Sequence, residues 1–324
     1  MKIARIEVFQ VTLPYAGGVY HLSGGRSYRD FDATITRVTS DDGVEGWGES
    51  TPFGATYIAA HALGVRAGIA EIAPHLIGLD PRRVDRINDA MDAGLVGHNH
   101  AKTALDVACW DLFGKSVGMP VCELLGGSTG VAMPVISSIP ADDPDRMRAN
   151  VADHRARGYR SHSVKIGALE SDGGPQLDAA RVKAALADRR PGEYYLVDAN
   201  GGLTTEHALR FLHLLPPGLD FVLEAPCATW GECVALRQRC QMPIIWDELA
   251  QEETGILRMI TEDAADGIGL KISKNGGLTR GRRQRDICIA AGLTLSIQET
   301  TGSDIAFAAL VHLAQTVPQR FLRS

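Results

Sequence analysis

The stretch Tyr194-Tyr195-Leu196-Val197-Asp198-Ala199-Asn200 indicates the fold of this chain, because it is a short apolar run that ends in a carboxylate. Comparable apolar runs recur at residues 134–138, 161–166, 220–224, 243–247, 267–271, 293–298 and 319–323. Helix-length stretches lie between them, including 176–188, 204–214, 230–240, 252–262, 277–290 and 303–315. Such alternation implies parallel strands joined by right-handed crossovers. Eight strands with intervening helices predict an α/β fold with a (β/α)8-type barrel over residues 128–324.

The first part of the chain, residues 1–127, has a different pattern and predicts a separate α+β domain. Its segments alternate polar and apolar residues as half-buried antiparallel strands do, and they are followed by a helix with an apolar face. The predicted elements are strands at 2–13, 33–39 and 44–49 and a helix at 99–115. Between the first two strands, Tyr15 to Ser27 contains four glycines and predicts a mobile loop.

Composition excludes several classes of protein. The 324 residues carry 33 Lys and Arg against 39 Asp and Glu, so the formal net charge is −6 and the basic surface of a nucleic-acid binder is missing. No apolar run approaches the ~20 residues that a membrane span needs. Six cysteines without a Cys-x-x-Cys pair predict reduced thiols in a cytoplasmic protein, with no zinc site. We therefore expect neither a nucleic-acid partner nor a membrane partner.

Charged residues at the ends of the predicted strands form the candidate site. Asp198, Glu224 and Asp247 follow consecutive strands at steps of 26 and 23 residues, and Lys271 follows 24 residues later. Lys165 ends the strand before Asp198. These side chains should meet at the carboxyl end of the barrel, where barrel enzymes keep their active sites. Three adjacent carboxylates repel one another without a cation, and their oxygens suit Mg²⁺ or Mn²⁺. The lysines should then flank the metal from opposite sides.

Several motifs carry a resemblance that covers essentially the whole chain. They are Ala104-Leu105-Asp106-Val107-Ala108-Cys109-Trp110-Asp111-Leu112-Phe113-Gly114-Lys115, Leu124-Leu125-Gly126-Gly127, and Lys271 followed by Gly276-Gly277. With the carboxylates, these motifs resemble the enolase superfamily in its muconate-lactonizing and mandelate racemase-type branch. The resemblance implies that residues 1–127 cap the barrel. It also implies Asp198, Glu224 and Asp247 as magnesium ligands, with Lys165 and Lys271 as acid and base on opposite faces of the substrate.

Within this branch the chain is most similar to the proline-type enzymes, which are cis-3-hydroxy-L-proline dehydratases and hydroxyproline betaine 2-epimerases. The stretches that carry this similarity are Glu49-Ser50-Thr51-Pro52-Phe53-Gly54, Thr56-Tyr57, Gly97-His98-Asn99-His100 and Leu223-Glu224-Ala225-Pro226-Cys227. Two departures stand out. Ser163 replaces the first lysine of the Lys-x-Lys pair that many members carry. The chain also stops at Ser324, where relatives continue, so we expect the C-terminal end of the barrel to be incomplete.

The resemblance implies a small-molecule carboxylate substrate whose α-proton is removed. Loss of a β-hydroxyl would make the enzyme a dehydratase of cis-3-hydroxy-L-proline, a carbon–oxygen lyase, which is our leading hypothesis. Alternatives are a proline-type or hydroxyproline betaine 2-epimerase, a muconate-type cycloisomerase and a non-enzymatic binding barrel. The chain is expected to form a homo-oligomer.

Substrate contacts are expected from the cap and from the segment after the seventh barrel strand. The candidate residues are Tyr20, Tyr57, Gln298, Glu299, Thr300 and Thr301. A quaternary betaine is best held by aromatic faces, and residues 298–302 contain none. Thr301 and Glu299 could accept hydrogen bonds from a secondary ammonium instead, which favours free 3-hydroxyproline. An alternative interpretation of Thr301 is that it only caps the next helix.

Overall fold

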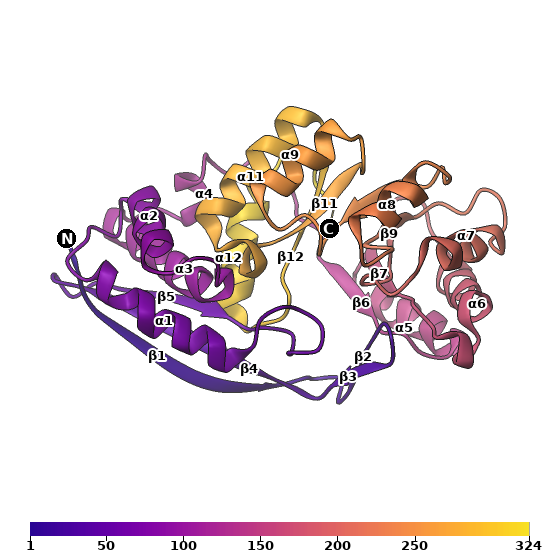
Figure 1. Cartoon of the computed structure of the whole chain (residues 1–324), viewed down its shortest axis with the longest axis horizontal. Helices are drawn as coiled ribbons and strands as arrows, with labels where there is room; N and C mark the ends of the chain where they lie inside the picture. Colours follow the sequence, from indigo (N-terminus) through magenta and orange to yellow (C-terminus); the bar gives the residue numbers. More distant parts are fainter. Residues whose placement is uncertain (324) are drawn as a thin grey trace.

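The computed structural model describes residues 1–323 and contains two sheets of different kinds. The antiparallel sheet of the N-terminal part has the order β1-β4-β5. Its elements are β1 (Ile3–Pro14), β2 (Tyr20–Leu22), β3 (Arg26–Tyr28), β4 (Asp30–Ser40), β5 (Glu45–Ser50), α1 (Ala62–Leu76), α2 (Val84–Gly94), α3 (Asn99–Val117) and α4 (Val121–Leu124). The helices pack on one face of the sheet, and the other face looks outward along the lower edge of Figure 1.

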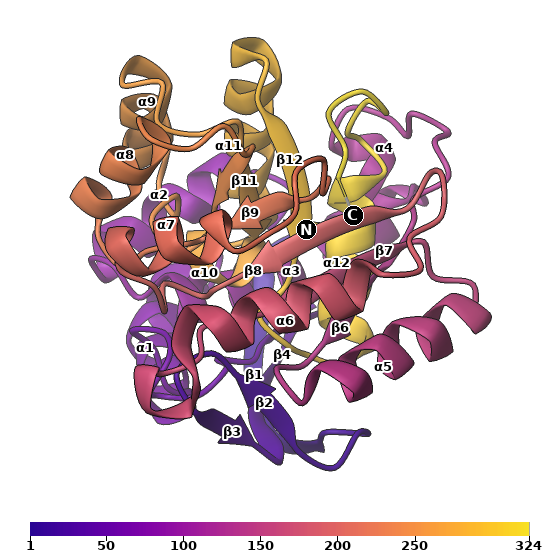
Figure 2. The same ribbon diagram turned by 90° about the vertical axis from the view of Figure 1, so that its right-hand side faces the viewer.

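The parallel sheet of the second part has seven strands in strict chain order, from β12 at one end to β6 at the other. Its elements are β6 (Ile136–Ile139), α5 (Pro144–Ala156), β7 (Ser161–Lys165), η1 (Glu170–Asp172), α6 (Gly174–Leu186), β8 (Tyr194–Asp198), α7 (Thr205–His213), β9 (Val222–Glu224), α8 (Trp230–Arg237), β10 (Ile244–Trp246), α9 (Glu253–Thr261), β11 (Gly267–Lys271), α10 (Ile272–Asn275), α11 (Leu278–Ala291), β12 (Thr294–Gln298) and α12 (Asp304–Ala314). Figure 2 shows α5 and α6 side by side near the end of the sheet that β6 forms.

These elements confirm the predicted α/β fold class and correct one strand of the expected barrel. The segment 319–323 is not a regular strand: it forms an isolated parallel bridge between Leu322 and Leu295, with Arg323 N–H donating to the Leu295 carbonyl at 2.8 Å. It therefore lies beside β12, where an eighth strand belongs, but is too short to form a ladder. The described sheet is curved and open between β12 and β6.

Each part has its own apolar core. One core lies between the antiparallel sheet and α1–α3, around Ile69, Ile72 and Leu105, which are fully buried. The other lies between the parallel sheet and its outer helices, where Leu223, Ile268 and Leu295 are fully buried. The division of the chain at residue 127 stays a prediction. In the described residues, none of the helices is both long and apolar enough to cross a membrane.

The Gly-rich segment 15–27 contains a short hairpin that sequence reasoning did not foresee. Strands β2 and β3 pair antiparallel, with Tyr20 opposite Tyr28. The turn between them needs glycine, because Gly24 and Gly25 have φ of 69° and 72°. Gly24 N–H donates to the Gly167 carbonyl at 3.2 Å, just beyond the end of β7, so the hairpin contacts the barrel.

Helix α3 fixes the N-terminal part against the segment that follows β11. Asp106 is completely buried and accepts hydrogen bonds from the Thr279 N–H at 3.0 Å and the Thr279 hydroxyl at 2.6 Å. The Asn99 amide donates to the Lys274 carbonyl at 3.1 Å. These contacts hold α10 and the start of α11 in a defined position, and Lys271 lies directly before α10.

Candidate functional site

The five charged residues singled out from the sequence lie together at the carboxyl ends of neighbouring strands. Lys165 is the register partner of Asp198, and Asp198 is the register partner of Glu224. Asp247 follows β10 directly, and Lys271 is the last residue of β11. Parallel strands in consecutive order bring these ends to one rim of the sheet. The predicted juxtaposition of the three carboxylates between two lysines is therefore what the structure contains.

Lysines pair with two of the three carboxylates. The Lys165 ammonium donates to Asp198 Oδ2, and the Lys271 ammonium donates to Asp247 Oδ2 at 2.6 Å. Glu224 is different: its Oε1 accepts from the Gln298 amide at 2.8 Å, whereas its Oε2 is buried without a hydrogen-bond partner in the described residues. All three carboxylates are at most 1 % exposed. A buried carboxylate oxygen without a partner is costly and indicates a missing cationic or donor group.

The pKa values of Glu224 and Asp247 are shifted in opposite directions. Burial, together with repulsion from Asp198 and Asp247, raises the pKa of Glu224 well above its usual value. Burial would also raise the pKa of Asp247, but Lys271 and Lys274 lower it to about 2. Burial alone would lower the pKa of Lys271, yet the surrounding carboxylates raise it above its usual value, and the same holds for Lys165. In this arrangement both lysines are therefore held as ammonium groups.

The donor set suits a hard divalent cation. Three buried carboxylates on adjacent strands, one with an unpaired oxygen, are the oxygen ligands that Mg²⁺ prefers. As the side chains lie, however, no three Asp, Glu, His or Cys residues among positions 1–323 are grouped closely enough to hold a metal ion. Lys165 and Lys271 hold two of the carboxylates instead. Ammonium groups thus take the place of a counter-ion in this structure, and a metal would compete with them.

A cavity of about 310 Å³ lies between the hairpin side of the N-terminal part and this rim of the sheet. We call it the inter-domain cavity. Both lysines line it, and so do all six candidate substrate-contact residues, which are Tyr20, Tyr57, Gln298, Glu299, Thr300 and Thr301. Aromatic residues of the N-terminal part form its apolar wall: Tyr15, Tyr20, Phe31, Phe53 and Tyr57. Its volume lies at the lower end of the range of small-molecule sites, which is about 300–1,000 Å³.

The candidate contact residues in this cavity have different hydrogen-bond partners. The Tyr20 hydroxyl is 2.7 Å from the Ser138 hydroxyl of β6. The Tyr57 hydroxyl donates to the Glu248 carboxylate and accepts from the Asn200 amide at 3.0 Å. Thr301 does not cap the next helix, because the Ser303 hydroxyl accepts from the Ile305 N–H of α12. The alternative interpretation of Thr301 as a cap is therefore wrong.

The segment after β12 is held by a half-buried acidic residue, Glu299. Glu299 Oε1 accepts from the Ser273 hydroxyl and from the Thr300 N–H at 2.7 Å. Burial raises the pKa of Glu299, although these hydrogen bonds lower it in part. Gln298 lines the cavity, but its amide already donates to Glu224.

Three residues of the site were not predicted from the sequence. Each lies within three residues of a predicted site residue, and this closeness in the sequence was the only available signal. Lys274, one helical turn after Lys271, is 4 % exposed and its ammonium donates to Asp247 Oδ1 at 3.0 Å. Asn200 lies two residues after Asp198 at φ 46°, and its amide contacts both Asp198 and Tyr57. Glu248 adjoins Asp247 and accepts from Tyr57.

The position of Lys274 is relevant to the missing first lysine of the Lys-x-Lys pair, which Ser163 replaces. Ser163 is 8 % exposed and lines the cavity, so strand β7 carries a single lysine at this rim. The additional cation lies on the opposite side instead, where Lys274 shares Asp247 with Lys271.

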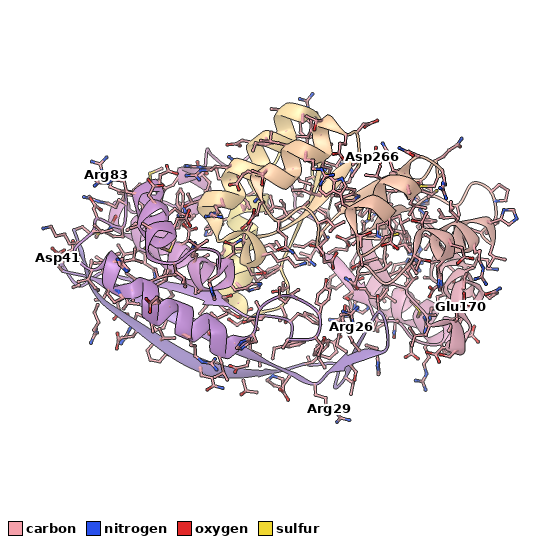
Figure 3. The ribbon with its side chains drawn as sticks, in the orientation of Figure 1. Arg26, Arg29, Asp41, Arg83, Glu170 and Asp266 are labelled. Atoms are coloured by element: carbon pink, nitrogen blue, oxygen red, sulfur yellow. The ribbon has the colours of Figure 1, made fainter. Side chains whose placement is uncertain are left out.

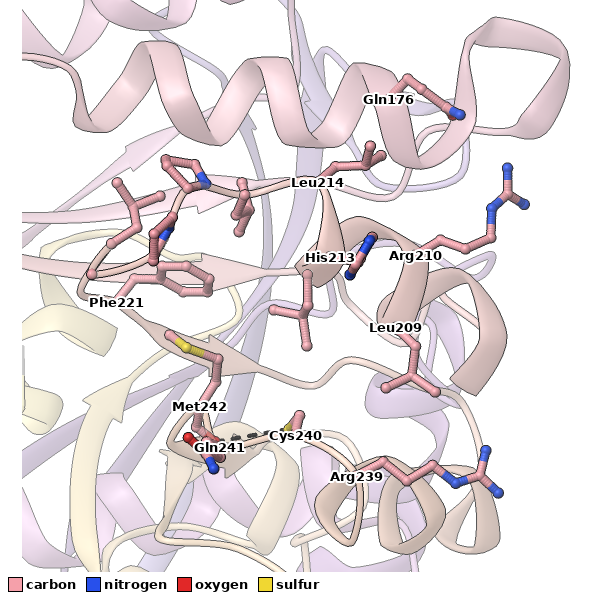
Figure 4. Close-up of a pocket in the computed structure, with 16 residues that line it drawn as sticks. Gln176, Leu209, Arg210, His213, Leu214, Phe221, Arg239, Cys240, Gln241 and Met242 are labelled. Atoms are coloured by element: carbon pink, nitrogen blue, oxygen red, sulfur yellow. Dashed lines mark hydrogen bonds between the residues drawn. The ribbon is translucent and has the colours of Figure 1, made fainter.

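A larger cavity of about 780 Å³ lies at the other end of the strands and has a different character (Figure 4). Phe221 and Met242 on its wall precede β9 and β10, whereas Leu209 and His213 come from α7. Its lining residues in the described chain include no carboxylate. Active sites of barrels lie at the carboxyl ends of strands, so the inter-domain cavity is the candidate site.

Comparison with known proteins identifies relatives over nearly the full length. Residues 23–126 match the mandelate racemase/muconate lactonizing enzyme N-terminal domain, and residues 146–323 match the enolase C-terminal domain-like family. The chain is 40 % identical over 321 residues to the cis-3-hydroxy-L-proline dehydratase of Roseibium aggregatum, which covers 99 % of this chain and 86 % of that protein.

Two solved structures are more similar still. A mandelate racemase/muconate lactonizing type protein of Roseovarius nubinhibens ISM, complexed with magnesium, is 57 % identical with a TM-score of 0.98, covering 100 % of this chain and 87 % of that one. Another of the same type from Aspergillus oryzae is 66 % identical with a TM-score of 0.93, covering 99 % and 86 % of the two chains.

Proposed function

Because the chain belongs to the mandelate racemase/muconate lactonizing enzyme family of the enolase superfamily, we propose that it is a magnesium-dependent dehydratase of cis-3-hydroxy-L-proline. One observation supports this most directly. Two lysines, on β7 and β11, line the same small cavity from either side of the three carboxylates. A relative 40 % identical over 99 % of the chain is a dehydratase of this substrate. The chain is accordingly an enzyme of the hydro-lyase class.

Asp198, Glu224 and Asp247 are the residues that would hold the metal. When bound there, Mg²⁺ would stabilise the negative charge that develops on the substrate carboxylate as the α-proton leaves. Lys165 and Lys271 donate to Asp198 and Asp247 and line the cavity beside them, so they are the groups that would exchange protons with the substrate. The lysine that takes the α-proton would have to be neutral to act as a base.

The two lysines divide the proton transfers of the elimination. One neutral lysine accepts the proton from Cα, and the lysine on the opposite face donates a proton to the β-hydroxyl as the Cβ–O bond breaks. The electron pair of the Cα–H bond forms the Cα=Cβ double bond, and water leaves. In cis-3-hydroxy-L-proline the hydroxyl and the α-hydrogen lie on opposite faces of the ring. Opposed lysines therefore suit an anti elimination.

The surroundings of Tyr57 favour the free amino acid over its betaine. The Arg26 guanidinium carbon is 5.2 Å from the Tyr57 ring centroid, and the Lys274 ammonium is 5.4 Å from it. A ring that already has two cations beside it is a poor receptor for a quaternary ammonium. The Glu299 carboxylate on the cavity wall can accept a hydrogen bond from a secondary ammonium, which a betaine lacks.

Proton NMR in D₂O with Mg²⁺ tests this function. The purified protein is offered cis-3-hydroxy-L-proline, trans-3-hydroxy-L-proline and a proline betaine in separate reactions. We expect loss of the hydroxyl from the cis isomer, and much slower loss from the trans isomer because its hydroxyl lies on the face of the α-hydrogen. Inversion at Cα without loss of the hydroxyl would establish an epimerase instead. Equal dehydration of the two isomers would contradict the anti elimination.

A further inference from the structure

A buried carboxylate of the N-terminal part, Glu49, lies at the end of β5 and contacts the start of α12. It is 2 % exposed. Its Oε1 accepts from the Ser303 N–H at 2.9 Å, and its Oε2 accepts from the Ser303 hydroxyl and from the Ala306 N–H at 3.3 Å. The Thr51 hydroxyl donates to the same carboxylate at 2.6 Å. Its hydrogen-bond partners are therefore all donors, and two of them are backbone groups in the first turn of a helix from the other part of the chain.

A second set of contacts joins the same two segments. The Thr300 hydroxyl donates to the Thr51 carbonyl at 2.9 Å and is 3.1 Å from the Ser273 hydroxyl. Segment 49–51 of the N-terminal part is thus fastened to segment 299–303 of the barrel. Figure 1 shows the lower end of α12 against β5, which these contacts join.

Both fastened segments lead directly into walls of the inter-domain cavity. Phe53 and Tyr57 follow Glu49 in the chain and line one side, and Gln298 to Thr301 precede Ser303 and line another. A shift between 49–51 and 299–303 would therefore change the distance between the aromatic wall and the polar wall. Helix N-terminal N–H groups and a carboxylate attract one another, so this carboxylate is well suited to hold that distance.

We propose that Glu49 is a positioning residue that sets the spacing of the two cavity walls and so determines how tightly the small ring substrate is held. The identity of the substrate in this proposal rests on the proposed function. The positions of the two walls do not, because they follow from the hydrogen bonds described above. Glu49 itself does not line the cavity and is not a catalytic residue. A replacement should therefore weaken substrate binding more than it slows the chemical step.

The test compares Glu49→Gln with Glu45→Gln. Glutamine keeps the size of Glu49 but turns one acceptor atom into a donor, which then faces other donors. Glu45 begins the same strand and forms an ion pair with Arg37 at 3.2 Å, at the far end from the cavity. We expect Glu49→Gln to raise KM about tenfold with a smaller change in kcat, whereas Glu45→Gln leaves both unchanged; misplacements of about 1 Å are known to have effects of this size or larger.

Hydrogen exchange supplies a measurement that does not depend on the substrate. We expect faster amide exchange in both 53–57 and 299–306 of Glu49→Gln, and in neither segment of Glu45→Gln. Faster exchange confined to α12, with KM unchanged, would show that Glu49 only caps that helix and would overturn the proposal. If the wild type does not dehydrate cis-3-hydroxy-L-proline but the variants show the expected differences in amide exchange, the proposed function is refuted and the role of Glu49 in holding the walls is not. If Glu49→Gln does not fold, Glu49→Asp takes its place in both measurements, because it keeps the charge and shortens the side chain by one methylene group while the Ser303 cap of α12 stays intact.

Discussion

Lys165 lies opposite Asp198 in the parallel register of β7 and β8, and its ammonium group donates a hydrogen bond to that carboxylate. The arrangement is repeated on the other side of the rim, where Lys271 contacts Asp247. Glu224 lies between the two pairs and keeps one buried oxygen without a partner in residues 1–323. A divalent cation bound to these carboxylates would therefore compete with the two lysines for Asp198 and Asp247.

Removal of one carboxylate should abolish metal binding and turnover. For Glu224→Gln we expect loss of the calorimetric signal for Mg²⁺ and a fall in turnover of about 10²–10³-fold, because the main electrostatic stabiliser is lost. The circular dichroism spectrum should stay unchanged. Glu170→Gln is the matched control, since Glu170 is exposed, pairs with Arg210 and lies at the periphery of Figure 3. Full activity of the wild type after exhaustive chelation would contradict the metal requirement.

Replacement of Lys165 and replacement of Lys271 should impair different steps of the reaction. Loss of the base should stop exchange of the α-proton with D₂O, whereas loss of the acid should leave exchange partly intact while dehydration falls. General acid–base groups contribute about 10²–10⁴-fold, which sets the expected size of each defect. Proton NMR of Lys165→Ala and Lys271→Ala measures both rates. The control is Lys183→Ala on the exposed face of α6. Identical exchange defects in the two variants would remove the support for separate acid and base roles.

The β2–β3 hairpin should become less accessible when a ligand fills the inter-domain cavity, as mobile active-site loops do. Arg29 follows β3 and points into solvent at the lower edge of Figure 3, so trypsin can cut there. We expect slower cleavage at Arg29 in the presence of Mg²⁺ and a proline-type ligand. Cleavage at Arg83, which lies far from the cavity, is the internal control. Unchanged rates at both sites would argue against a lid.

A buried ion pair at the start of β8 should make stability depend on pH. Burial would raise the pKa of Glu193, but hydrogen bonds from Arg155 and neighbouring donors lower it to about 2. The folded-state pKa is below the usual value, so the stabilisation is fully present above about pH 5 and is lost as the pH falls towards 2. We expect Glu193→Gln to lower the free energy of unfolding by about 1.5–3 kcal/mol at pH 7 and by less than about half as much near pH 3.

Urea unfolding at the two pH values measures this difference. Glu206→Gln serves as the control, because Glu206 is exposed at the surface of α7 and pairs weakly with Arg210. An equal loss of stability at both pH values would mean that the charge of Glu193 is not responsible.

The sequence by itself determined the strand–helix alternation and the residues at the strand ends. Apolar runs at a step of one βα unit predict parallel neighbours, and parallel neighbours bring Asp198, Glu224, Asp247 and Lys271 to one rim. The family resemblance added the roles of these residues, which stay proposals. The cap strands and the helix at 99–115 were also predictable, because their periodicity is local.

Only the tertiary structure decided which other groups reach that rim. Lys274 and Asn200 lie near site residues in the sequence, but nothing local shows that their side chains turn toward Asp247 and Asp198. Glu49 is 254 residues away from Ser303, and no pattern in either segment predicts their contact. The segment at 319–323 satisfied the strand pattern and still formed only a bridge. Side-chain direction and long-range contacts depend on the packing of the two parts of the chain, which local periodicity does not encode.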